Sequence, residues 1–271
     1  MQQKIKLTPE NYYSHKTDWE YMSVSLFKDF ERCEAAALAK LKDDWQPTSN
    51  PIALIVGNYV HSFFESKKSH AKFLKNYEPV LFSTRGKTKG QLKHDFVVAD
   101  EMISTLQFDP LFTDVYQGDK EVIVTGQIDG INWKGKIDCL NVKEGYFCDL
   151  KTTRDIRQRV WSDEASKYVP FVIADEYVLQ MAIYKKLLEQ TYNKPFTPYI
   201  FAVSKQTPPD KCGIRIDEGR YQTEYDKVNR LLPEFVAVMD GETAPKYCGH
   251  CEYCRQMKQL HGFAEIEEIM K

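Results

Sequence analysis

The sequence lacks the features that mark several common classes of protein. No apolar stretch is long enough to span a membrane and no signal peptide is recognisable, so we expect a cytoplasmic protein with no membrane partner. The chain also lacks internal repeats, low-complexity tracts and a linker rich in proline, glycine or serine. We therefore expect residues 1–271 to form a single domain, with 42% hydrophobic residues available for its core.

A strong charge of one sign is also missing from the chain. Its formal net charge is −2, so no global positive field predicts nucleic-acid binding. The segment from Lys67 to Lys93 is the exception, because its only acidic residue is Glu78. Within it, Arg85, Lys87 and Lys89 form a basic loop that can contact a phosphate backbone, although a solvated helix face and an exposed loop fit equally well. The loop lacks the glycine-x-x-x-x start of a Walker A motif, which excludes a nucleotide-driven motor.

The stretch around residue 140 predicts a β-hairpin. Two short apolar runs, Ile137–Val142 and Tyr146–Leu150, flank a Lys-Glu-Gly turn at 143–145. An upstream apolar run, Glu121–Gly126, adds a third strand. We therefore expect a three-stranded meander over about 121–153.

Three charged residues of this hairpin are the most informative in the chain. Alternate residues of a strand face opposite sides, so Asp149 and Lys151 share one face while Leu150 points to the other. Asp138 approaches them when the two runs pair. A solvated strand face would also explain the pattern, but apolar neighbours on both sides favour a central hairpin. Two carboxylates can hold a hard divalent cation and a lysine can stabilise a charged nucleophile, which suits phosphodiester hydrolysis.

Two predicted helices add further polar candidates. A helix over 57–65 places His61 and Glu65 four residues apart on one face. A second helix at about 173–190 places Gln180 and Tyr184 at the same spacing. Each pair is weak alone, because His61 also fits a half-buried helix histidine and the other residues are ordinary in helices.

Cysteine is present in a pattern that predicts a metal site. Cys248, Cys251 and Cys254 form a C-x2-C-x2-C run. Without a signal peptide a disulfide framework is not expected, and clustered thiolates in a reducing compartment more often hold a metal. Three cysteines need a fourth ligand, but the position where a ferredoxin-type run would place it is Lys258. The other cysteines outside this run are expected to be buried thiols or bystanders, namely Cys139, Cys148 and Cys212.

Taken together, the hairpin resembles the core of the PD-(D/E)xK nuclease superfamily. Asp149, Leu150 and Lys151 match the D-x-K half of its signature, and Asp138 takes the place of the first Asp, although Ile137 precedes it instead of Pro. The resemblance implies an α/β fold with a restriction-endonuclease-like core, in which helices flank a central mixed sheet.

Within the superfamily the chain is most similar to the RecB-like branch, and there to the RecE-type exonuclease domain of phages and prophages. The segment 21–30, the spacing Gly57-x-x-x-His61 and the spacing Gln180-x-x-x-Tyr184 carry this likeness. The resemblance implies that Mg²⁺ or Mn²⁺ is bound and that Lys151 orients the attacking water or stabilises the transition state. The implied metal ligands are His61, Asp138, Asp149 and the carbonyl of Leu150, with Glu65 as a partner of His61 and with Gln180 and Tyr184 contacting the metal shell or the substrate.

The same resemblance implies an activity and partners. It implies digestion of linear double-stranded DNA from its ends, 5′ to 3′, with the 3′ tail passed to a single-strand annealing protein in recombination, and a ring-like homo-oligomer. Two alternatives stay open, a single-strand DNA exonuclease of the CRISPR-associated iron–sulfur kind and a non-catalytic DNA-binding scaffold. The presence of Asp138, Asp149 and Lys151 together argues against the scaffold.

The cysteine pattern also resembles the iron–sulfur nucleases of the RecB-like branch. In these, one N-terminal and three C-terminal cysteines share a [4Fe–4S] cluster, and Cys33 matches the N-terminal one. The resemblance implies that this cluster joins the N-terminal helix to the C-terminal tail, 245–258. Zinc is the alternative metal, with His250 or His261 as a possible ligand.

A coarse pass predicts the remaining elements. Residues 154–170 are expected to form a mobile loop that carries Trp161 and Tyr168 and either flanks the DNA entrance or merely connects its neighbours. Pro208 marks a turn between two late strands. The expected helices are at about 23–42, 53–76, 91–106, 173–190 and 219–239, and the late strands at 197–204 and 212–217.

Overall fold

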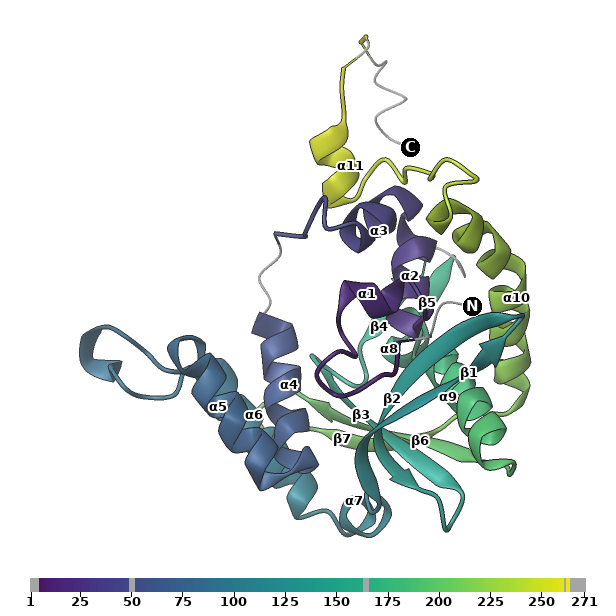
Figure 1. Ribbon diagram of the computed structural model, residues 1–271. Coiled ribbons are helices and arrows are strands. Elements are labelled where there is room, and N and C mark those ends of the chain that lie inside the picture. The colour runs from purple at the N-terminus through teal and green to yellow at the C-terminus, as the bar shows by residue number, and fades with distance from the viewer. Residues whose placement is uncertain (1–4, 49–51, 163–165, 261, 264–271) are drawn as a thin grey trace.

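A mixed five-stranded sheet forms the centre of the computed structural model, which describes residues 5–48, 52–162, 166–260 and 262–263 (Figure 1). The strand order is β1-β2-β3-β6-β7; β3 and β6 are parallel and the other neighbours are antiparallel. The expected mixed central sheet flanked by helices is thus confirmed. The strands are β1(Asp119–Ile128), β2(Ile131–Asn141), β3(Tyr146–Thr153), β6(Thr197–Ser204) and β7(Lys211–Arg215).

Helices cover both faces of the sheet (Figure 1). One hydrophobic cluster joins the sheet to α2(Val24–Arg32), α3(Glu34–Leu41), α9(Tyr177–Tyr192) and α10(Gly219–Met239). Another joins it to α4(Ile52–Glu65), α5(Lys67–Leu81), α6(His94–Gln107) and α7(Pro110–Val115). No helix in the described part of the chain combines the length and apolar character needed to cross a membrane. The shorter elements are α1(His15–Asp18), η1(Gly86–Thr88), β4(Arg159–Ser162), β5(Lys167–Pro170), α8(Phe171–Ala174) and α11(Glu252–Met257).

Strand β3 shows how the sequence pattern divides the two layers. Phe147 is buried in the cluster beneath α9, whereas Cys148 and Leu150 are buried in the cluster beneath α4. Each large apolar side chain buried in this way stabilises the fold by about 1.5–3 kcal/mol. The alternation leaves Asp149 and Lys151 on the same side of the strand, as the sequence predicted.

A two-residue turn sets the register between β1 and β2. Asp129 and Gly130 both have positive φ, 50° and 78°, which suits the tight hairpin turn that their Asp-Gly sequence favours. Ile128 therefore pairs with Ile131, and the pairing continues to Asp119 opposite Leu140.

Strand β2 stays with β3 over only a short length. Cys139, Leu140 and Asn141 pair with the start of β3, and the two strands then diverge. Beyond the divergence, Met22 of the N-terminal segment pairs with the free edge of β2 at Trp133. The gap opened between β2 and β3 is where the polar residues of the hairpin gather.

Three predicted elements differ from those observed. The single helix expected over 23–42 is two helices, because Cys33 has an extended backbone, with φ −168° and ψ 106°. The helix expected over 53–76 also divides, at Ser66, whose side chain caps α5 by accepting from the backbone of Ser69. The segment 154–170 is not only a loop, because β4 and β5 within it form a separate two-stranded sheet.

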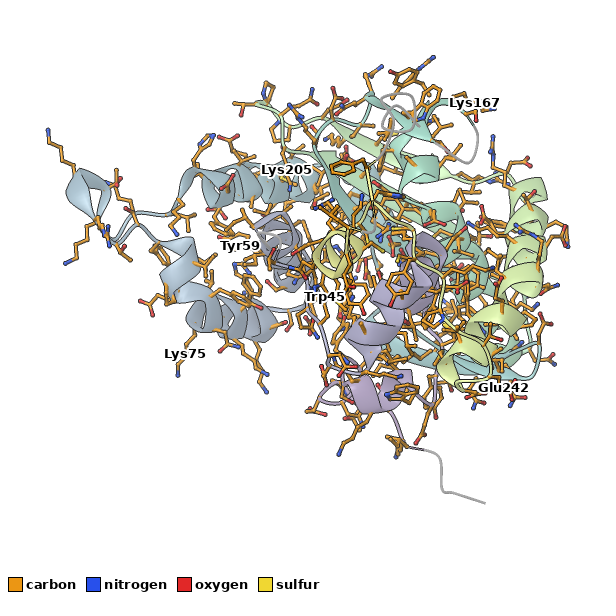
Figure 2. All side chains as sticks on the ribbon, turned by 90° about the horizontal axis from the view of Figure 1, so that it is seen from above. Trp45, Tyr59, Lys75, Lys167, Lys205 and Glu242 are labelled. Atoms are coloured by element: carbon orange, nitrogen blue, oxygen red, sulfur yellow. The ribbon has the colours of Figure 1, made fainter. Side chains whose placement is uncertain are left out.

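The basic loop between α5 and α6 projects away from the rest of the molecule (Figures 1 and 2). Phe82 pairs with Leu92 at its base, and Gly90 N–H donates to the Ser83 carbonyl. Arg85, Lys87 and Lys89 are exposed near its tip, as an exposed loop requires, and the structure places them outside the gap between β2 and β3. Their role in binding DNA stays a prediction.

Candidate active site

Three acidic side chains occupy one row across three neighbouring strands. The β1–β2 pairing joins Lys120 to Cys139 and Val122 to Ile137, so Glu121 stands opposite Asp138. The β2–β3 pairing ends at Cys139 and Cys148, so the next position brings Asp138 beside Asp149. The strands separate there, and the Leu150 N–H donates to Asp138 Oδ2 at 2.8 Å instead of to a backbone carbonyl. The row is therefore a product of strand register.

Helix α4 brings a histidine to this row. His61 Nδ1 lies 3.4 Å from Asp138 Oδ2. Gly57, one turn earlier, lies against β3, where a Cβ would make an ordinary contact with the Thr152 hydroxyl at 3.5 Å. The i, i+4 spacing places His61 on the same face of the helix as Gly57.

Helix α9 supplies an amide that joins the other two polar groups. Gln180 Nε2 donates to Asp149 Oδ1 at 2.8 Å, while its Oε1 accepts from Lys151 Nζ at 2.9 Å. Lys151 Nζ also lies 2.7 Å from Asp149 Oδ2 and 4.5 Å from the centre of the Tyr177 ring. The ammonium group is thus held between a carboxylate, an amide oxygen and an aromatic face.

Burial and mutual repulsion shape the protonation of the carboxylates. Burial, and then the charge of Asp149, raises the pKa of Asp138 to about 7. The pKa of Glu121 is raised by burial and by Asp138. Lys136 pairs with Glu121, and Lys151 favours the ionised form of Asp138, but neither lysine outweighs burial and the neighbouring carboxylate. Each carboxylate therefore keeps a deficit of positive charge. A cation placed among these groups would relieve that deficit.

The two nitrogen groups have opposite tendencies. Burial, and then Lys151, lowers the pKa of His61, so its imidazole is neutral at pH 7 and keeps a lone pair for a ligand. Burial also opposes the charge on Lys151, but Asp149 and Asp138 outweigh it, and the pKa of Lys151 is raised. Lys151 is therefore a permanent cation and donor, not a base.

The donor set fits a hard divalent cation. Ligand atoms of His61, Glu121 and Asp138 all lie within 4.8 Å of one another. Asp149 Oδ2 is buried and accepts no hydrogen bond from the described part of the chain, although Lys151 lies close to it. Carboxylate oxygens with one imidazole suit Mg²⁺ or Mn²⁺. The backbone carbonyl of Leu150 stays a predicted ligand.

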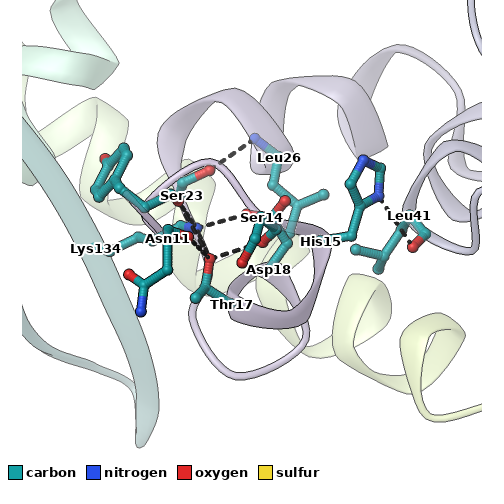
Figure 3. A network of polar contacts seen from close by, with 10 residues as sticks. Asn11, Ser14, His15, Thr17, Asp18, Ser23, Leu26, Leu41 and Lys134 are labelled. Carbon is teal, nitrogen blue, oxygen red and sulfur yellow. Dashed lines mark hydrogen bonds and ion pairs between the residues drawn. The ribbon is translucent and has the colours of Figure 1, made fainter. Parts of the chain in front are cut away.

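The N-terminal segment forms one wall of the cleft above this row. Lys134 of β2 is 1% exposed, and its Nζ donates to the Thr17 hydroxyl and to the Tyr12 carbonyl, both at 2.7 Å (Figure 3). The same ammonium group pairs with Asp18 at 2.7 Å. The resulting cleft has a volume of about 650 Å³ and runs between this wall and helices α4 and α5.

Tyr184 lies at the floor of the cleft. Its ring packs on Gly135, where a Cβ would come within 2.8 Å of it. Burial raises the pKa of Tyr184 well above its usual range, so the phenol stays protonated. Tyr184 can therefore pack and donate, and a contact with substrate stays a prediction.

The hydrogen bond that Glu65 makes does not involve the row of acidic residues. It accepts a hydrogen bond from Ser69 on the next helix, although its side chain also lines the cleft. The expected partnership with His61 stays a prediction.

Sequence reasoning missed two residues of this site. Glu121 was identified only as the start of a strand. Counting seven positions back from Ile128 and seven forward from Ile131, the pair that flanks the turn, would have placed it opposite Asp138. Tyr177 lies three residues before Gln180, and that helical spacing would have placed its ring beside Lys151.

A separate cluster joins the four predicted cysteines. Cys33 Sγ lies 3.6 Å from Cys254 Sγ, and Cys248 Sγ lies 3.8 Å from it. The four sulfur atoms, with that of Cys251, are all within 4.8 Å of one another. The expectation that Cys33 lies beside the three C-terminal cysteines is confirmed.

Backbone contacts support the cysteine cluster. The Cys251 N–H donates to Cys248 Sγ at 3.3 Å, and the Cys254 N–H donates to Cys251 Sγ at 3.4 Å. Burial raises the pKa of Cys248, but N–H groups of His250 and Cys251 outweigh it and bring that pKa to about 6. Burial, by contrast, raises the pKa of Cys251 and brings that of Cys254 to about 12. Four sulfur atoms this close suit a soft metal, whose binding would release the remaining thiol protons. His250 is exposed and bonds the Cys248 carbonyl through its ring, and His261 falls outside the described residues.

Two cysteines expected to be single are in fact neighbours. Cys139 and Cys148 pair directly across β2 and β3, and both are fully buried. Lys120 Nζ donates to Cys139 Sγ at 3.0 Å. Cys212 is exposed, so of the two expected kinds it is a bystander and not a buried thiol.

Comparisons with known proteins agree with this geometry. A family model described as a PDDEXK-like domain of unknown function (DUF3799) matches residues 23–257. The chain is similar to a solved structure from Eubacterium rectale, described as "Putative exonuclease", with a TM-score of 0.88, 33% identity and coverage of 98% of each chain. A structure described as SSO0001 has a TM-score of 0.31 at 15% identity, covering 84% of this chain and 90% of that one, which is too distant to inform the fold. No curated protein matches.

The matched region contains the sheet, the row of carboxylates and all four clustered cysteines. The chain therefore belongs to the PDDEXK-like domain family, within the PD-(D/E)xK nuclease superfamily.

Proposed function

We propose that this protein is a metal-dependent DNA exonuclease that hydrolyses phosphodiester bonds from the ends of linear duplex DNA. The observation that carries the proposal is the row of Glu121, Asp138 and Asp149 with Lys151 beside it and His61 above it. A buried set of carboxylates around a permanent cation has no apparent structural purpose, because apolar residues would stabilise the strand junction at lower cost.

The proposed ligands of Mg²⁺ or Mn²⁺ are His61, Asp138, Asp149 and the Leu150 carbonyl, with Glu121 as an addition from the structure. When bound, the cation would lower the pKa of a water molecule and offset charge on the scissile phosphate. Because its pKa is raised to about 7, Asp138 would lose its proton on binding the cation. The imidazole of His61 is already neutral and would offer its lone pair directly.

Lys151 has the role of an electrostatic donor. Because its pKa is raised, it cannot accept a proton from water near pH 7. Its Nζ can donate to the attacking oxygen or to a phosphate oxygen as negative charge develops there. Gln180 fixes this ammonium group and Asp149 relative to each other, so it is a positioning residue.

The direction of digestion, the biological setting, the partner and the assembly are inferred from the resemblance to RecE-type domains. We infer 5′-to-3′ polarity, a setting in phage-type recombination, an annealing protein as partner and a homo-oligomeric assembly from that resemblance. We also infer that the chain is a single domain, because its cysteine cluster and N-terminal wall tie distant parts of the sequence together. For the cysteine cluster we propose a [4Fe–4S] group, with zinc as the alternative.

A second function is favoured by one observation. The grouping of Cys33 with the three C-terminal cysteines matches the layout of CRISPR-associated iron–sulfur nucleases, which supports a single-strand DNA exonuclease as the alternative. The two differ in substrate and not in the chemistry of the cleft.

One experiment tests both functions. Linear duplex DNA labelled separately at its 5′ and 3′ ends, and a labelled single strand, are incubated with Mg²⁺ or Mn²⁺, beside an Asp149→Ala control. Metal-dependent loss of the 5′ label from the duplex, absent in the control, is the expected result. Degradation of the single strand alone would support the alternative, and no degradation of either would reject both.

A further inference from the structure

The β4–β5 hairpin presents two aromatic rings to solvent. Trp161 and Tyr168 are directly opposite each other across the two strands, with ring centres 5.3 Å apart. Trp161 is 52% exposed and Tyr168 63%, whereas Trp133 in the main sheet is completely buried. A surface that keeps large paired rings accessible commonly serves recognition.

The hairpin is anchored at its other side. Val169, between the exposed Tyr168 and Pro170, is buried, and so are Phe171 and Val172 of the helix that follows. The alternation directs one side of β5 into the protein and leaves the aromatic side outward. The rings are therefore displayed on a fixed support.

Basic side chains line a groove just beyond the end of strand β3. Arg154 and Lys205 line one shallow groove with Gln158, and its volume is about 410 Å³. The backbone at Lys205 is held there because its main-chain N–H donates to the carbonyl of Thr153, the last residue of β3. Burial lowers the pKa of Lys205, which Asp95 only partly opposes. A phosphate nearby would favour its charged form.

The groove is close to the catalytic strand. Arg154 is three positions after Lys151, which corresponds to about 10 Å along an extended chain. Strands β3 and β6 are parallel, so Lys205 follows the end of β6 at the same edge of the sheet. Lys167 of the hairpin and Lys205 both lie toward this side of the molecule, away from α5 and Lys75 (Figure 2). One acidic side chain, Asp155, also lines the groove and accepts from the Arg157 N–H, while Asp210 pairs with the Arg157 side chain. The two cations of the groove therefore outnumber its one carboxylate.

We propose that Trp161 and Tyr168 form a stacking surface for the bases of single-stranded DNA, with Arg154 and Lys205 binding its phosphates between that surface and the cleft. Exposed rings bind unpaired bases through their faces, which a duplex keeps stacked internally, and flanking cations follow the backbone. The charge complementarity of the groove selects a polyanion over an apolar partner. The proposal rests on the proposed nuclease function. It adds that the DNA in contact with this side of the protein is single-stranded.

Binding can be measured without cleavage. Full-length protein in buffer without added divalent metal is titrated into a fluorescein-labelled dT oligonucleotide about 12 nucleotides long, within the range covered by such surfaces. Fluorescence anisotropy gives the affinity, and a gel confirms that the oligonucleotide stays intact. The variants are Trp161→Ala/Tyr168→Ala and, as the matched control, Trp161→Phe/Tyr168→Phe, which keeps both rings.

The expected result is affinity at least about tenfold weaker for the double alanine variant and within about twofold of wild type for the phenylalanine pair. Equal affinity of the alanine variant and wild type would overturn the proposal. So would an equal loss of affinity for a closed hairpin duplex, because bases inside it have no free faces.

A second readout separates this proposal from the nuclease assignment. Hydrolysis of bis(p-nitrophenyl) phosphate with Mn²⁺ needs the carboxylate row but no extended strand, so both hairpin variants should match wild type. If wild type hydrolyses neither this ester nor DNA while ring-dependent binding persists, the nuclease function fails and the binding surface stands. If hydrolysis is normal but the alanine substitutions leave DNA binding unchanged, the nuclease function stands and the binding surface fails.

Discussion

The protein contains two clusters of potential metal ligands that are built in opposite ways. The carboxylate row comes from adjacent positions on three neighbouring strands, and its ligands are hard oxygen and nitrogen atoms. The cysteine cluster joins residues 221 positions apart, Cys33 and Cys254, through soft sulfur atoms. The first is held by sheet pairing whether or not a cation is bound. The second also depends on what its sulfurs would bind, although hydrogen bonds such as that from Trp45 Nε1 to Gln256 Oε1 hold the C-terminal tail as well.

The difference predicts that one cluster governs chemistry and the other governs stability. Inside the row, Lys151, Gln180 and Asp149 bond to one another, which prepares charges for a substrate. Around the cysteines, the contacts instead connect backbones of distant segments, such as the Ala35 N–H with the Lys246 carbonyl at 3.0 Å. Substitutions in the two clusters should therefore separate activity from folding.

The largest effect is expected for Lys151→Ala. Removing the one ammonium group beside Asp149 should slow DNA hydrolysis by about 10²–10³-fold or more, the cost of losing one preorganised transition-state donor. DNA affinity and the melting temperature should stay close to wild type. Lys143→Ala, which removes a lysine whose side chain is 91% exposed, is the matched control. Wild-type turnover by Lys151→Ala would reject the assignment.

The next effect is expected for Cys254→Ser. Without the Cys254 sulfur the protein should release the metal. The free energy of unfolding should then fall by about 4 kcal/mol, the stabilisation given by a metal present at about 1,000 times its Kd. Thermal melting and metal analysis of anaerobically purified protein measure the two changes. Cys212→Ser, at an exposed cysteine outside the cluster, should change neither. Wild-type protein with neither iron nor zinc would remove the metal from this cluster.

A smaller effect is expected for Glu121→Gln. The amide is a weaker ligand, so the Mn²⁺ concentration for half-maximal hydrolysis should rise by about 10–100-fold, the range seen when groups around a metal are altered. Glu65→Gln is the matched control, because Glu65 also lines the cleft but bonds Ser69. Equal shifts in both variants would show that charge in the cleft matters and the position of Glu121 does not.

The smallest effect concerns a carboxylate outside both clusters. Burial, and then a hydrogen bond with Glu176, raises the pKa of Glu31 to about 7. The folded state then keeps a proton that the unfolded chain loses between about pH 4.5 and 7, so this group's contribution to stability falls as pH rises through that window. The lowered pKa of Glu176 acts in the opposite direction, at lower pH.

Glu31→Gln should flatten that pH dependence. The difference in melting temperature between pH 5 and pH 7.5 should shrink by a small amount, because Glu31 is only partly buried and solvent screens it. Glu144→Gln, at an exposed glutamate, should leave the difference unchanged. A steeper dependence in the Glu31 variant would contradict the assigned direction.

The sequence predicted the parts of the fold that depend on local pattern. Strand β6 and helix α10 have the expected bounds, 197–204 and 219–239, because a short continuous apolar run marks the strand and helical periodicity extends over the helix. The break at Cys33 was not predicted, because no glycine or proline marks it. The chain leaves the helical conformation there to bring one sulfur to the C-terminal tail, which is a tertiary requirement.

The sequence predicted the site residues that belong to short motifs. It did not predict Glu121, whose place in the site depends on the register between two strands. His61, Asp138, Asp149 and Lys151 were expected together, and the structure brings them together, while their roles stay predictions. The β4–β5 hairpin was missed because strands of four residues give too little alternation to recognise.

The Asp129–Gly130 turn has a consequence for which changes in length the chain can accept. Seven residues separate Ile128 from Glu121, and seven separate Ile131 from Asp138, so the two acids meet only while both arms keep equal length. One inserted residue in either arm would move an acid to the opposite face of the sheet. Substitutions along either strand should be tolerated where packing permits. Insertions and deletions between residues 121 and 138 should not occur in copies of the protein that remain active.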